Sequence, residues 1–531
     1  MNRLASMEAL APLQQRFFRT IWTASLVANI CLWMNDVAAA WMMTSLTDRP
    51  IMVALVQTAS TLPVFLLGLP SGALADIVDR RSYFMVTQFW VAGSATLLGL
   101  TVAMGAINPT VLLLLVFANG LGLAMRWPVY SAIVPELVTR AQLPAAMALN
   151  GVAMNASRIV GPIIAGILIA AGGTAWVFAL NAVLSVLTGF VILTWKRERK
   201  VSALPGEQFL GAIRVGFQYV RQSPRMHTVL LRTALFLAQA AALVALLPLI
   251  ARAMPNATAN TYTALLAMIG IGAICSAFYL PRWRAALPPD ELIRRGTWGH
   301  AGCLVLAALA PNVWVAMPAM IGAGLAFLAV ANTIAVSAQM SLPDWVRARG
   351  MSVYQMALMG GSALGAALWG QVATLTSVNA ALVIAAVSGV GGLWLTRNRQ
   401  LEHSQVEDLT PAQQLKAPVA GWALDPSDGP VLTTIEYRID PERANEFREV
   451  MEHTRRRRLS RGALSWELFR DTADPGRFIE YMLDESWNEH LRRFERMTTF
   501  DEQLRDRRLE FHIGEEPPRI RRSIADATKR E

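Results

Sequence analysis

The chain has 531 residues, of which 54% are hydrophobic and only 16% are charged, and its formal net charge is +10. A soluble domain has about 25% charged residues, so this composition excludes a cytosolic enzyme, a disordered chain and a secreted disulfide scaffold. Residues 1–396 hold 24 Lys and Arg against 11 Asp and Glu, whereas residues 397–531 hold 24 against 27. We therefore expect a membrane-embedded region followed by a soluble one.

Twelve mostly apolar runs follow one another through the first 396 residues. A helix that crosses a bilayer needs about 20 such residues. The runs cover residues 18–42, 51–74, 83–105, 109–131, 146–170, 175–195, 228–251, 262–280, 296–311, 313–337, 348–373 and 378–396. The run at 296–311 is the shortest and ends at a proline. The pattern predicts an all-α polytopic membrane protein with twelve transmembrane helices.

The loops between these runs differ strongly in basic residues. One alternate set of loops, with the N-terminal segment, holds 19 Lys and Arg, whereas the opposite set holds only Arg49 and Arg252. Because Lys and Arg are enriched in cytoplasmic loops, we expect both termini to be cytoplasmic and the protein to lie in the cytoplasmic (inner) membrane. We interpret these bases as topology signals beside the lipid bilayer, and we expect no nucleic-acid partner.

The loop after the second run has the sequence GLPSGALADIVDRR at residues 68–81. It resembles the signature of major facilitator superfamily transporters between helices two and three, G-x-L-A-D-x-x-G-R-R/K. The matching residues are Gly72, Leu74, Ala75, Asp76, Arg80 and Arg81, whereas Ile77 and Asp79 replace the usual Arg and Gly.

This resemblance implies a conformational motif. Asp76 would face the positive N-terminal end of the eleventh helix, which starts near Pro343, and Arg80 would pair with Glu136 at the end of the fourth helix. The alternative interpretation is an ordinary basic cytoplasmic loop.

Further segments are similar to one branch of this superfamily, the transmembrane secretion effectors, which includes siderophore and drug exporters. The segments are WMNDVAAAW at 33–41, QTASTLP at 57–63, RWP at 126–128, PELV at 135–138 and LN at 149–150. The resemblance covers about residues 15–396 and, more weakly, the tail. It implies the major facilitator fold and export of small molecules by secondary transport.

The fifth run carries RIVGPIIAG at 158–166, which resembles the G-P-x-x-G-G end of the antiporter motif with Ala165 in place of one glycine. In the family, Gly161, Pro162 and Gly166 would favour export by antiport. The alternative is a packing kink, because Gly and Pro are common in membrane helices.

The two sets of six runs resemble each other. The segment from Gly120 to Ala124 is echoed by the segment from Gly322 to Ala326, about 202 residues later. Two parallel six-helix repeats are typical of transporters that bind their substrate at the midplane. We predict a six-helix bundle at 1–195 and a second at 228–396, joined by a cytoplasmic linker at 196–227. In the linker, the spacing of Phe209, Ile213, Phe217 and Val220 predicts an interfacial amphipathic helix.

Asp36, Arg126 and Arg158 lie at membrane depth, where charges are costly and normally face a cavity or each other. Asp36 is the only acid well inside a run, which makes it the candidate for proton coupling. Alternatively, it is a permanently ionised partner of Arg126 or Arg158. Arg126 would meet an anionic substrate or the Asp36 carboxylate. Amide side chains that would line the cavity, or instead bond between helices, are Asn35, Gln57, Asn150 and Asn155.

The soluble tail follows a polar linker at 397–429 and occupies residues 430–531. Strand patterns at 431–439, 464–469 and 478–483 alternate with helical patterns at 441–459 and 487–508. This βαββα order predicts a small α+β domain, a ferredoxin-like half unit. It resembles small dimeric α/β barrels of the antibiotic-biosynthesis-monooxygenase type, so we expect dimerisation through this domain.

The polar side chains of the tail show no reactive set. His453, His490 and His512 lack metal-ligand spacing, and we expect them on the solvated surface. We expect the run Arg455–Arg458 on a solvated face or on a patch that faces the membrane, and not at a nucleic acid.

The sequence favours a secondary transporter that exports small molecules in exchange for protons. Its partners would be a small-molecule substrate and protons, and we expect no catalytic residue, no metal and no cofactor. The alternative function is a membrane-anchored enzyme or sensor in which the C-terminal domain carries the activity.

Overall fold

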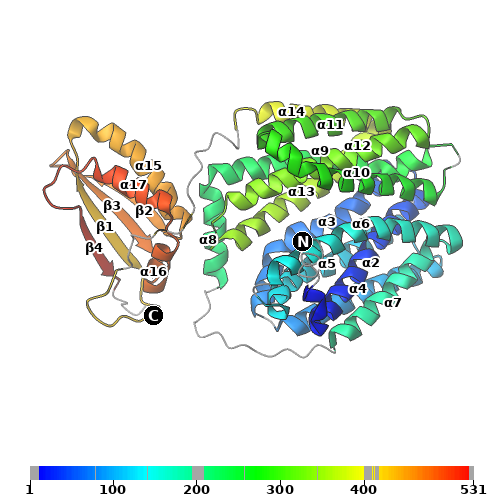
Figure 1. The fold of residues 1–531 in the computed structure, drawn as a ribbon, viewed down its shortest axis with the longest axis horizontal. Coiled ribbons are helices and arrows are strands. Elements are labelled where there is room, and N and C mark those ends of the chain that lie inside the picture. Colours follow the sequence, from blue (N-terminus) through cyan, green and yellow to red (C-terminus); the bar gives the residue numbers. More distant parts are fainter. Residues whose placement is uncertain are drawn as a thin grey trace, which may run out of the picture. The chain divides into compact units, whose positions relative to one another are not determined.

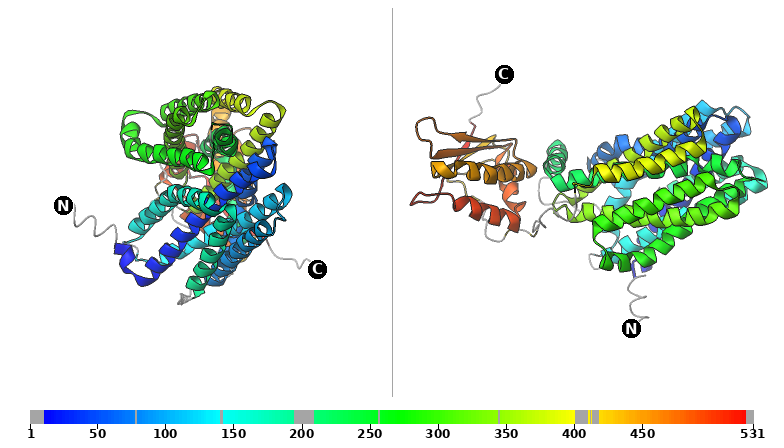
Figure 2. Two further views of the ribbon diagram at one scale, coloured as in Figure 1. Left: turned by 90° about the vertical axis from the view of Figure 1, so that its right-hand side faces the viewer. Right: turned by 90° about the horizontal axis from the view of Figure 1, so that it is seen from above.

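The computed structural model describes residues 11–77, 79–139, 142–193, 209–255, 257–343, 345–399, 410, 412 and 418–525. Contacts divide the chain into two compact units, whose elements are labelled in Figure 1 and seen from two further sides in Figure 2. The first holds residues 1–203, 230–336 and 354–400, and the second holds residues 204–229, 337–353 and 401–531. The five segments expected from the sequence, with their bounds, stay a prediction.

The first bundle consists of six long helices that follow a single 3-10 turn, η1 (Ala11–Gln14). These helices are α2 (Arg16–Leu46), α3 (Pro50–Ile77), α4 (Arg80–Ala103), α5 (Pro109–Leu137), α6 (Leu143–Gly172) and α7 (Thr174–Leu193). Each corresponds to one of the first six apolar runs, and either contains the run or agrees with it within a few residues. The apolar runs therefore located these helices correctly.

The second bundle also has six long helices. They are α9 (Pro224–Arg252), α10 (Ala259–Ala286), α11 (Pro289–Leu309), α12 (Val313–Met340), α13 (Arg347–Leu375) and α14 (Val378–Leu395). In the described part of the chain, eleven helices are long and apolar enough to cross a membrane. α11 is not apolar enough to be counted among them, although its 21 residues span about 31 Å, which is long enough. Its first turns carry Asp290 and Glu291, and Asp290 pairs with Arg232 of α9.

The same packing device recurs in both bundles. In α5, Gly120 lies against the backbone of α3 at Ser60, and Gly122 lies against Val91 of α4. In α12, Gly324 lies against the backbone of α10 at Ile269, and Gly322 lies against Cys303 of α11. At each of these positions a Cβ would collide with its neighbour, so only glycine allows the helices to approach this closely. The fourth helix of each bundle thus packs on the second and third through two glycines, but the corresponding glycines exchange neighbours: Gly120 contacts the second helix and Gly322 the third.

The two bundles share an apolar core at one end, where α2 leads into α3 and α9 into α10; we call this the joined end. The core includes Met42, Met43, Val53, Leu247, Ala251, Ala308, Ala316 and Ala381. Trp41 of α2 stacks on Tyr262 of α10 with ring centroids 6.0 Å apart. The Thr58 hydroxyl of α3 donates a hydrogen bond of 2.9 Å to the Ala363 carbonyl of α13.

At the opposite end of the helices, the split end, each bundle has a core of its own within the described residues. Phe18, Ile21, Tyr83, Phe84, Tyr130 and Ile133 form the core of the first bundle. Leu280, Leu292 and Ala329 form that of the second. Among the described residues, the bundles therefore share an apolar core at the joined end and have separate apolar cores at the split end.

The tail contains a four-stranded antiparallel sheet in the order β2-β3-β1-β4. The strands are β1 (Val431–Arg438), β2 (Ser465–Arg470), β3 (Arg477–Asp484) and β4 (Arg519–Ile524). The helices are η3 (Pro441–Arg443), α15 (Ala444–Ser460), α16 (Trp487–Glu495) and α17 (Thr499–Leu509). Tyr437, Phe478 and Met482 on one face of the sheet form a core with Phe447 and Met451 of α15.

Two expectations for the tail are corrected. The ferredoxin-like half unit is a whole unit, because β4 pairs with β1 and closes a βαββαβ order. The sequence of β4, RIRRSI, does not alternate between apolar and polar residues, so it gave no strand signal. The helix expected at 487–508 is two helices, since Thr498 and Asp501 form a capping box that starts α17.

The linker between the bundles forms α8 (Phe209–Gln222), which belongs to the same compact unit as the tail. Val215, Tyr219 and Val220 of α8 are buried, whereas Phe217 is exposed. Arg214 of α8 forms an ion pair with Glu485, and Tyr219 meets Trp345 edge to face at 5.8 Å. The side chains of Phe209 and Ile213 lie outside the described part of the structure. α8 thus forms at the expected place, and its buried face packs within the tail's own unit.

Candidate functional site

One face of α2 carries the residues around which the polar site is built. Asn29, Trp33 and Asp36 are spaced by four and three residues, so they lie above one another on the same side of the helix. Asp36 is half-buried, and its Oδ1 accepts a hydrogen bond of 3.1 Å from the Ser60 hydroxyl of α3. Gln57 lies one turn from Ser60 on α3 and is also half-buried. The Asp36 carboxylate therefore has a neutral partner.

Arg126 of α5 is buried beside the same helix face. Its Nη2 donates a hydrogen bond of 3.0 Å to Asn29 Oδ1, and the neighbouring Tyr130 hydroxyl donates one of 2.8 Å to Asn150 Oδ1. Together with Ser25 and Met154 these side chains enclose a space of about 10 Å³, which is at the lower limit for one water molecule. Arg126 is thus held by an amide in a closed polar pocket.

Arg158 of α6 lies between two aromatic rings from different bundles. Its guanidinium carbon is 5.6 Å from the Trp33 ring of α2 and 5.3 Å from the Phe327 ring of α12. Phe327 stacks on Phe236 at 5.9 Å, and Phe236 contacts the buried His300 ring at 5.7 Å. Sequence reasoning did not single out His300, although an ionisable residue inside an apolar run was a signal for it.

The three charged residues therefore gather along one side of α2, but in this conformation they do not pair with one another. Asp36 bonds to Ser60, Arg126 to Asn29, and Arg158 stacks on rings. Each of these three charges is matched by a neutral group.

The amides expected to line a cavity separate into different environments. Asn35 is fully buried between α2 and α7, where its Oδ1 accepts a hydrogen bond of 3.2 Å from Asn181. Asn155 is exposed and donates to the Gly151 carbonyl of its own helix at 2.9 Å. Asn150 bonds to Tyr130 beside Arg126. The structure thus places Asn150 at the polar site and Asn35 in a helix contact.

The antiporter-like residues of α6 lie where that helix touches two others. A Cβ on Gly161 would meet Trp33 and the Ile30 carbonyl of α2, and one on Gly166 would meet Thr263 of α10. Pro162 is buried between them. Gly161 and Gly166 therefore allow α6 to pack closely on α2 in its own bundle and on α10 in the other.

A family model described as "transmembrane secretion effector" matches residues 7–530 of the chain. The chain belongs to this family.

Named relatives of this secretion effector are transporters. It is 25% identical to the enterobactin exporter of Salmonella typhimurium over 70% of this chain and 89% of that protein. It is 22% identical to the staphyloferrin A transporter of Staphylococcus aureus over 47% of this chain, a match that spans 63% of that protein's length. It is also 23% identical to the macrolide efflux protein A of Streptococcus pyogenes over 45% of this chain and 60% of that protein.

Solved transporters share the fold. A POT family transporter in complex with 5-aminolevulinic acid superposes with a TM-score of 0.60 at 12% identity, covering 74% of this chain and 97% of that one. The nucleoside transporter NupG superposes with a TM-score of 0.59 at 12% identity, covering 72% and 99%. These matches confirm the major facilitator fold expected from the sequence, and the chain is a multi-pass membrane protein.

In this secretion effector, the conformational motif spans the end of α3 and the start of α4. The side chains of Asp76, Arg80 and Glu136, and residue Gly72, lie outside the described part of the structure. Leu74 is exposed, and Arg81 Nη2 donates a hydrogen bond of 2.5 Å to the Leu193 carbonyl. Asp79, which replaces the family's glycine, caps α4 by accepting a hydrogen bond of 2.9 Å from the Ser82 amide.

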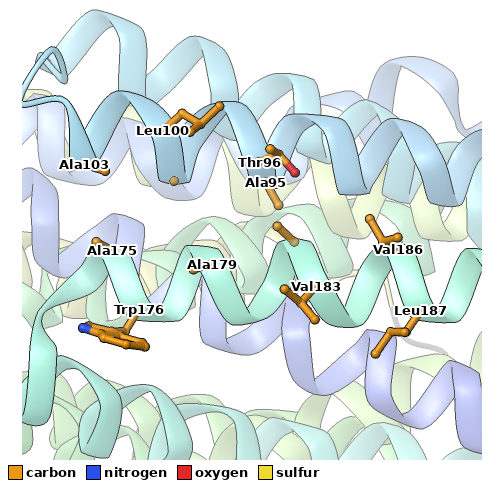
Figure 3. A pocket seen from close by; sticks show the side chains of 12 residues that line it. Ala95, Thr96, Leu100, Ala103, Ala175, Trp176, Ala179, Val183, Val186 and Leu187 are labelled. Carbon is orange, nitrogen blue, oxygen red and sulfur yellow. The ribbon is translucent and has the colours of Figure 1, made fainter.

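A cavity of about 610 Å³ lies between α4 and α7, away from the charged site. Figure 3 shows its two walls, with Ala95, Thr96, Leu100 and Ala103 on one and Trp176, Ala179, Val183 and Leu187 on the other. Leu100, Trp176 and Val183 are exposed. Large exposed apolar side chains on a transmembrane helix face lipid tails, so we assign this groove to the lipid surface and not to the site.

Proposed function

We propose that this secretion effector is a secondary active transporter that exports small molecules across the cytoplasmic membrane in exchange for protons. Siderophore-like and drug-like molecules are the substrate class, because the matched relatives are named for enterobactin, staphyloferrin A and macrolides. The observation that carries the proposal is a set of membrane-depth charges, led by Asp36, that lies beside the contact between two bundles fastened at one end only.

Alternating access follows from the way the bundles are fastened. The joined end is held by Trp41 on Tyr262 and by the hydrogen bond from Thr58 to Ala363, while the split end has two separate cores. A rocking motion that opens the joined end and closes the split end would expose the midplane to the other side. With both termini in the cytoplasm, as the loop charges predict, the present conformation is the one that opens inward.

Asp36 is the residue that we assign to proton coupling. A carboxylate at membrane depth is costly unless it is paired, and here its partner is the Ser60 hydroxyl. Arg158 lies against the Trp33 ring, one helical turn from Asp36, and also contacts Phe327 of the other bundle. A relative motion of the bundles would therefore separate Arg158 from Phe327. The approach of Arg158 to Asp36 in the other conformation would expel the proton, and the return would take up a new one.

Arg126 is the residue that we assign to substrate recognition. Its guanidinium is held by Asn29 in a pocket too small for more than one water molecule. If the pocket widens as the bundles move, an anionic substrate group would replace the amide as the partner of Arg126 and gain a charge-assisted hydrogen bond.

The test is transport by purified protein in liposomes with an imposed pH gradient. Enterobactin, staphyloferrin A and a macrolide are the probes, and a pH dye trapped inside reports proton movement. We expect at least one probe to move protons in the direction opposite to its own movement. If a probe is transported and the dye signal stays that of empty liposomes, export by proton antiport is wrong.

The orientation is tested separately. Reporter fusions after residues 200 and 400 should both give a cytoplasmic signal. A periplasmic signal at either position would overturn the proposed topology.

We also propose that the tail dimerises through the sheet face that its own helices leave open. Phe469 is exposed there, and it meets Tyr481 edge to face at 6.2 Å. Light scattering of the full chain in detergent should give a dimer, and Phe469→Arg should give a monomer. A monomer in the unmodified protein would contradict this proposal.

A further inference from the structure

The tail holds a cavity of about 260 Å³ between the helix-covered face of its sheet and the helices α15, α16 and α17. Thr433 and Ile435 of β1 and Met482 of β3 form its floor, and Ile520 of β4 lies at its edge. The cavity is somewhat smaller than the range of about 300–1,000 Å³ that ligand pockets usually occupy.

The wall of the cavity is strongly basic. It contains seven arginines and one acid, Asp501. The arginines are Arg457, Arg458, Arg461, Arg493, Arg505, Arg508 and Arg522. Three further acids pair with these arginines and bring the formal charge of this cluster to +3, from seven positive and four negative groups. These acids are Glu480, which pairs with Arg458 at 3.1 Å, Asp484, which pairs with Arg493 at 3.0 Å, and Asp506, which pairs with Arg505 at 2.9 Å.

Several donors in this wall are buried and have no hydrogen-bond partner. They are Nε and Nη1 of Arg493, which is 1% exposed, and Nε of Arg508, which is 7% exposed. The hydroxyl of Thr433, which is 2% exposed, is also unpartnered. An unmet buried donor costs about 1–3 kcal/mol and more when charged, so native proteins rarely leave several in one place. Three side chains that line the cavity thus have donors without a hydrogen-bond partner.

Crowding of like charges adds to this cost. Burial lowers the pKa of Arg461 well below its usual range, and the neighbouring Arg457 and Arg458 lower it further. Burial also lowers the pKa of Arg493 to about 10. An anion in the cavity would both accept the unused hydrogen bonds and reduce the repulsion between these guanidinium groups.

The rest of the lining is apolar and reaches the surface. Phe494 of α16 and Leu504 of α17 line the cavity, and so does Met497 from the turn between these helices. Pro518 and Ile520 form the rim, and Ile520 is 48% exposed. A ligand that enters beside β4 would therefore place its charged group on the arginines and an apolar body against these side chains.

We propose that this cavity, the tail pocket, binds a small organic oxyanion, a carboxylate or phosphate group on an aromatic or aliphatic body. The site belongs to the cytoplasmic domain and is separate from the polar site in the membrane. It stands on the tail's own residues and does not depend on the proposed transport.

The test is isothermal titration calorimetry on the full chain in detergent with phenyl phosphate, inorganic phosphate and benzyl alcohol. We expect phenyl phosphate to bind, inorganic phosphate to bind more weakly because it lacks the apolar body, and benzyl alcohol to give no heat. Equal binding of benzyl alcohol, or no binding of phenyl phosphate, would overturn the proposal.

Two neighbouring arginines of β4 supply a matched pair of variants. Arg522 lines the tail pocket, whereas Arg521 points to the opposite face of the strand. Arg522→Gln should weaken phenyl phosphate binding by about tenfold, the loss expected for one charge-assisted hydrogen bond. Arg521→Gln removes the same charge and should leave the affinity unchanged. An equal effect of both variants would show only a general field of positive charge and would refute the pocket.

Arg493→Gln should remove binding altogether, but it also breaks the pair with Asp484 and risks unfolding the domain. Ile520→Trp avoids that risk, because this half-exposed side chain lies at the rim. We expect Ile520→Trp to block phenyl phosphate while hydrogen exchange of β1 and β3 stays unchanged. Unaltered binding by this variant would place the ligand elsewhere.

Discussion

The charges at membrane depth and the charges of the tail have opposite kinds of partner, although Arg232, nearer the end of α9, pairs with Asp290. In the bundles, Asp36 is held by a hydroxyl, Arg126 by an amide and Arg158 by two aromatic rings. In the tail, buried Glu480, Asp484 and Asp501 each form an ion pair with arginine.

The difference separates charges that fix a fold from charges that are free to change partners. Breaking a buried ion pair leaves its partner uncompensated, which is strongly destabilising, so the tail is locked into one arrangement. A membrane charge on a neutral partner loses less when that partner is exchanged. We infer that the bundles keep their charges for function and the tail keeps its paired charges for structure.

The largest effect expected from this contrast is on Asp36. Asp36→Asn fixes the group in a neutral state, keeps an acceptor for Ser60 and removes the site of proton exchange. Transport driven by a pH gradient should fall to the level of empty liposomes, while counterflow exchange down a substrate gradient survives. The protein should insert and fold as before, because no ion pair is broken.

The matched control is Asp48→Asn, which removes an exposed acid from the loop after α2. It should leave gradient-driven transport unchanged. Wild-type gradient-driven transport by Asp36→Asn would make Asp36 structural and place the coupling residue elsewhere.

In the tail, the corresponding change should break the fold. Glu480 is fully buried and accepts from Arg458, Trp466 and Tyr437. Glu480→Gln leaves Arg458 and Arg508 without a counter-charge, which costs about 3–5 kcal/mol. Hydrogen exchange of β1 and β3 in the full chain should rise, whereas exchange of α2 and α3 should not.

Glu467 offers the control, because it lies on the neighbouring strand with its side chain exposed. Glu467→Gln should leave exchange as it is. If Glu480→Gln is equally harmless, the buried pairs do not hold the tail together.

Low pH should also destabilise the tail, by somewhat less than Glu480→Gln does. Burial alone would raise the pKa of Glu480, but Arg458 and Arg508 outweigh it and lower the pKa to about 2. A lowered carboxyl pKa gives stability that is present above the unfolded pKa of about 4.3 and is lost as the pH falls toward the folded value. The difference of about two units corresponds to about 3 kcal/mol.

Burial also lowers the pKa of His490, so the cost of protonating it adds to the loss at low pH. Chemical unfolding of the tail, followed between pH 8 and pH 2, should show a midpoint that falls below about pH 6.5 because of His490, and more steeply below about pH 4.5 because of Glu480. Glu480→Gln should flatten that dependence. A midpoint that does not change with pH would contradict the assignment.

Sequence reasoning found the membrane helices and Asp36 because each signal is local. Apolar runs show where α2 to α7 and α9 to α14 lie, and one acid inside such a run stands out. The partners of Arg126 and Arg158 were not predicted, since Asn29 and Phe327 come close only when helices far apart in sequence pack.

In the tail, local signals were ambiguous. Ile479, Tyr481 and Leu483 are apolar on one face of β3, while Phe478 and Met482 are apolar on the other, so alternation did not show which face is buried. The buried face also carries Glu480 and Asp484.

His490 and the run Arg455–Arg458 were expected at the surface. That expectation is wrong for His490, Arg457 and Arg458. His490 is fully buried between Asp484 and Arg522, and Arg457 and Arg458 line the tail pocket.

The smallest expected effect concerns the conformational motif, where a charge meets a helix end. Asp76→Asn removes the negative charge that the family resemblance places before the N-terminus of α13, an interaction worth about 0.3–1 kcal/mol and up to about 2 kcal/mol when partly buried. Transport should therefore slow by about twofold to thirtyfold with normal insertion. Asp79→Asn makes the same charge change three residues later. Asparagine caps helices as well as aspartate does, so the variant keeps the acceptor for the Ser82 amide at the start of α4. We expect Asp79→Asn to transport at the wild-type rate. Equal rates for both variants at equal expression would mean that the loop acts only as a topology signal, as its basic residues alone would predict.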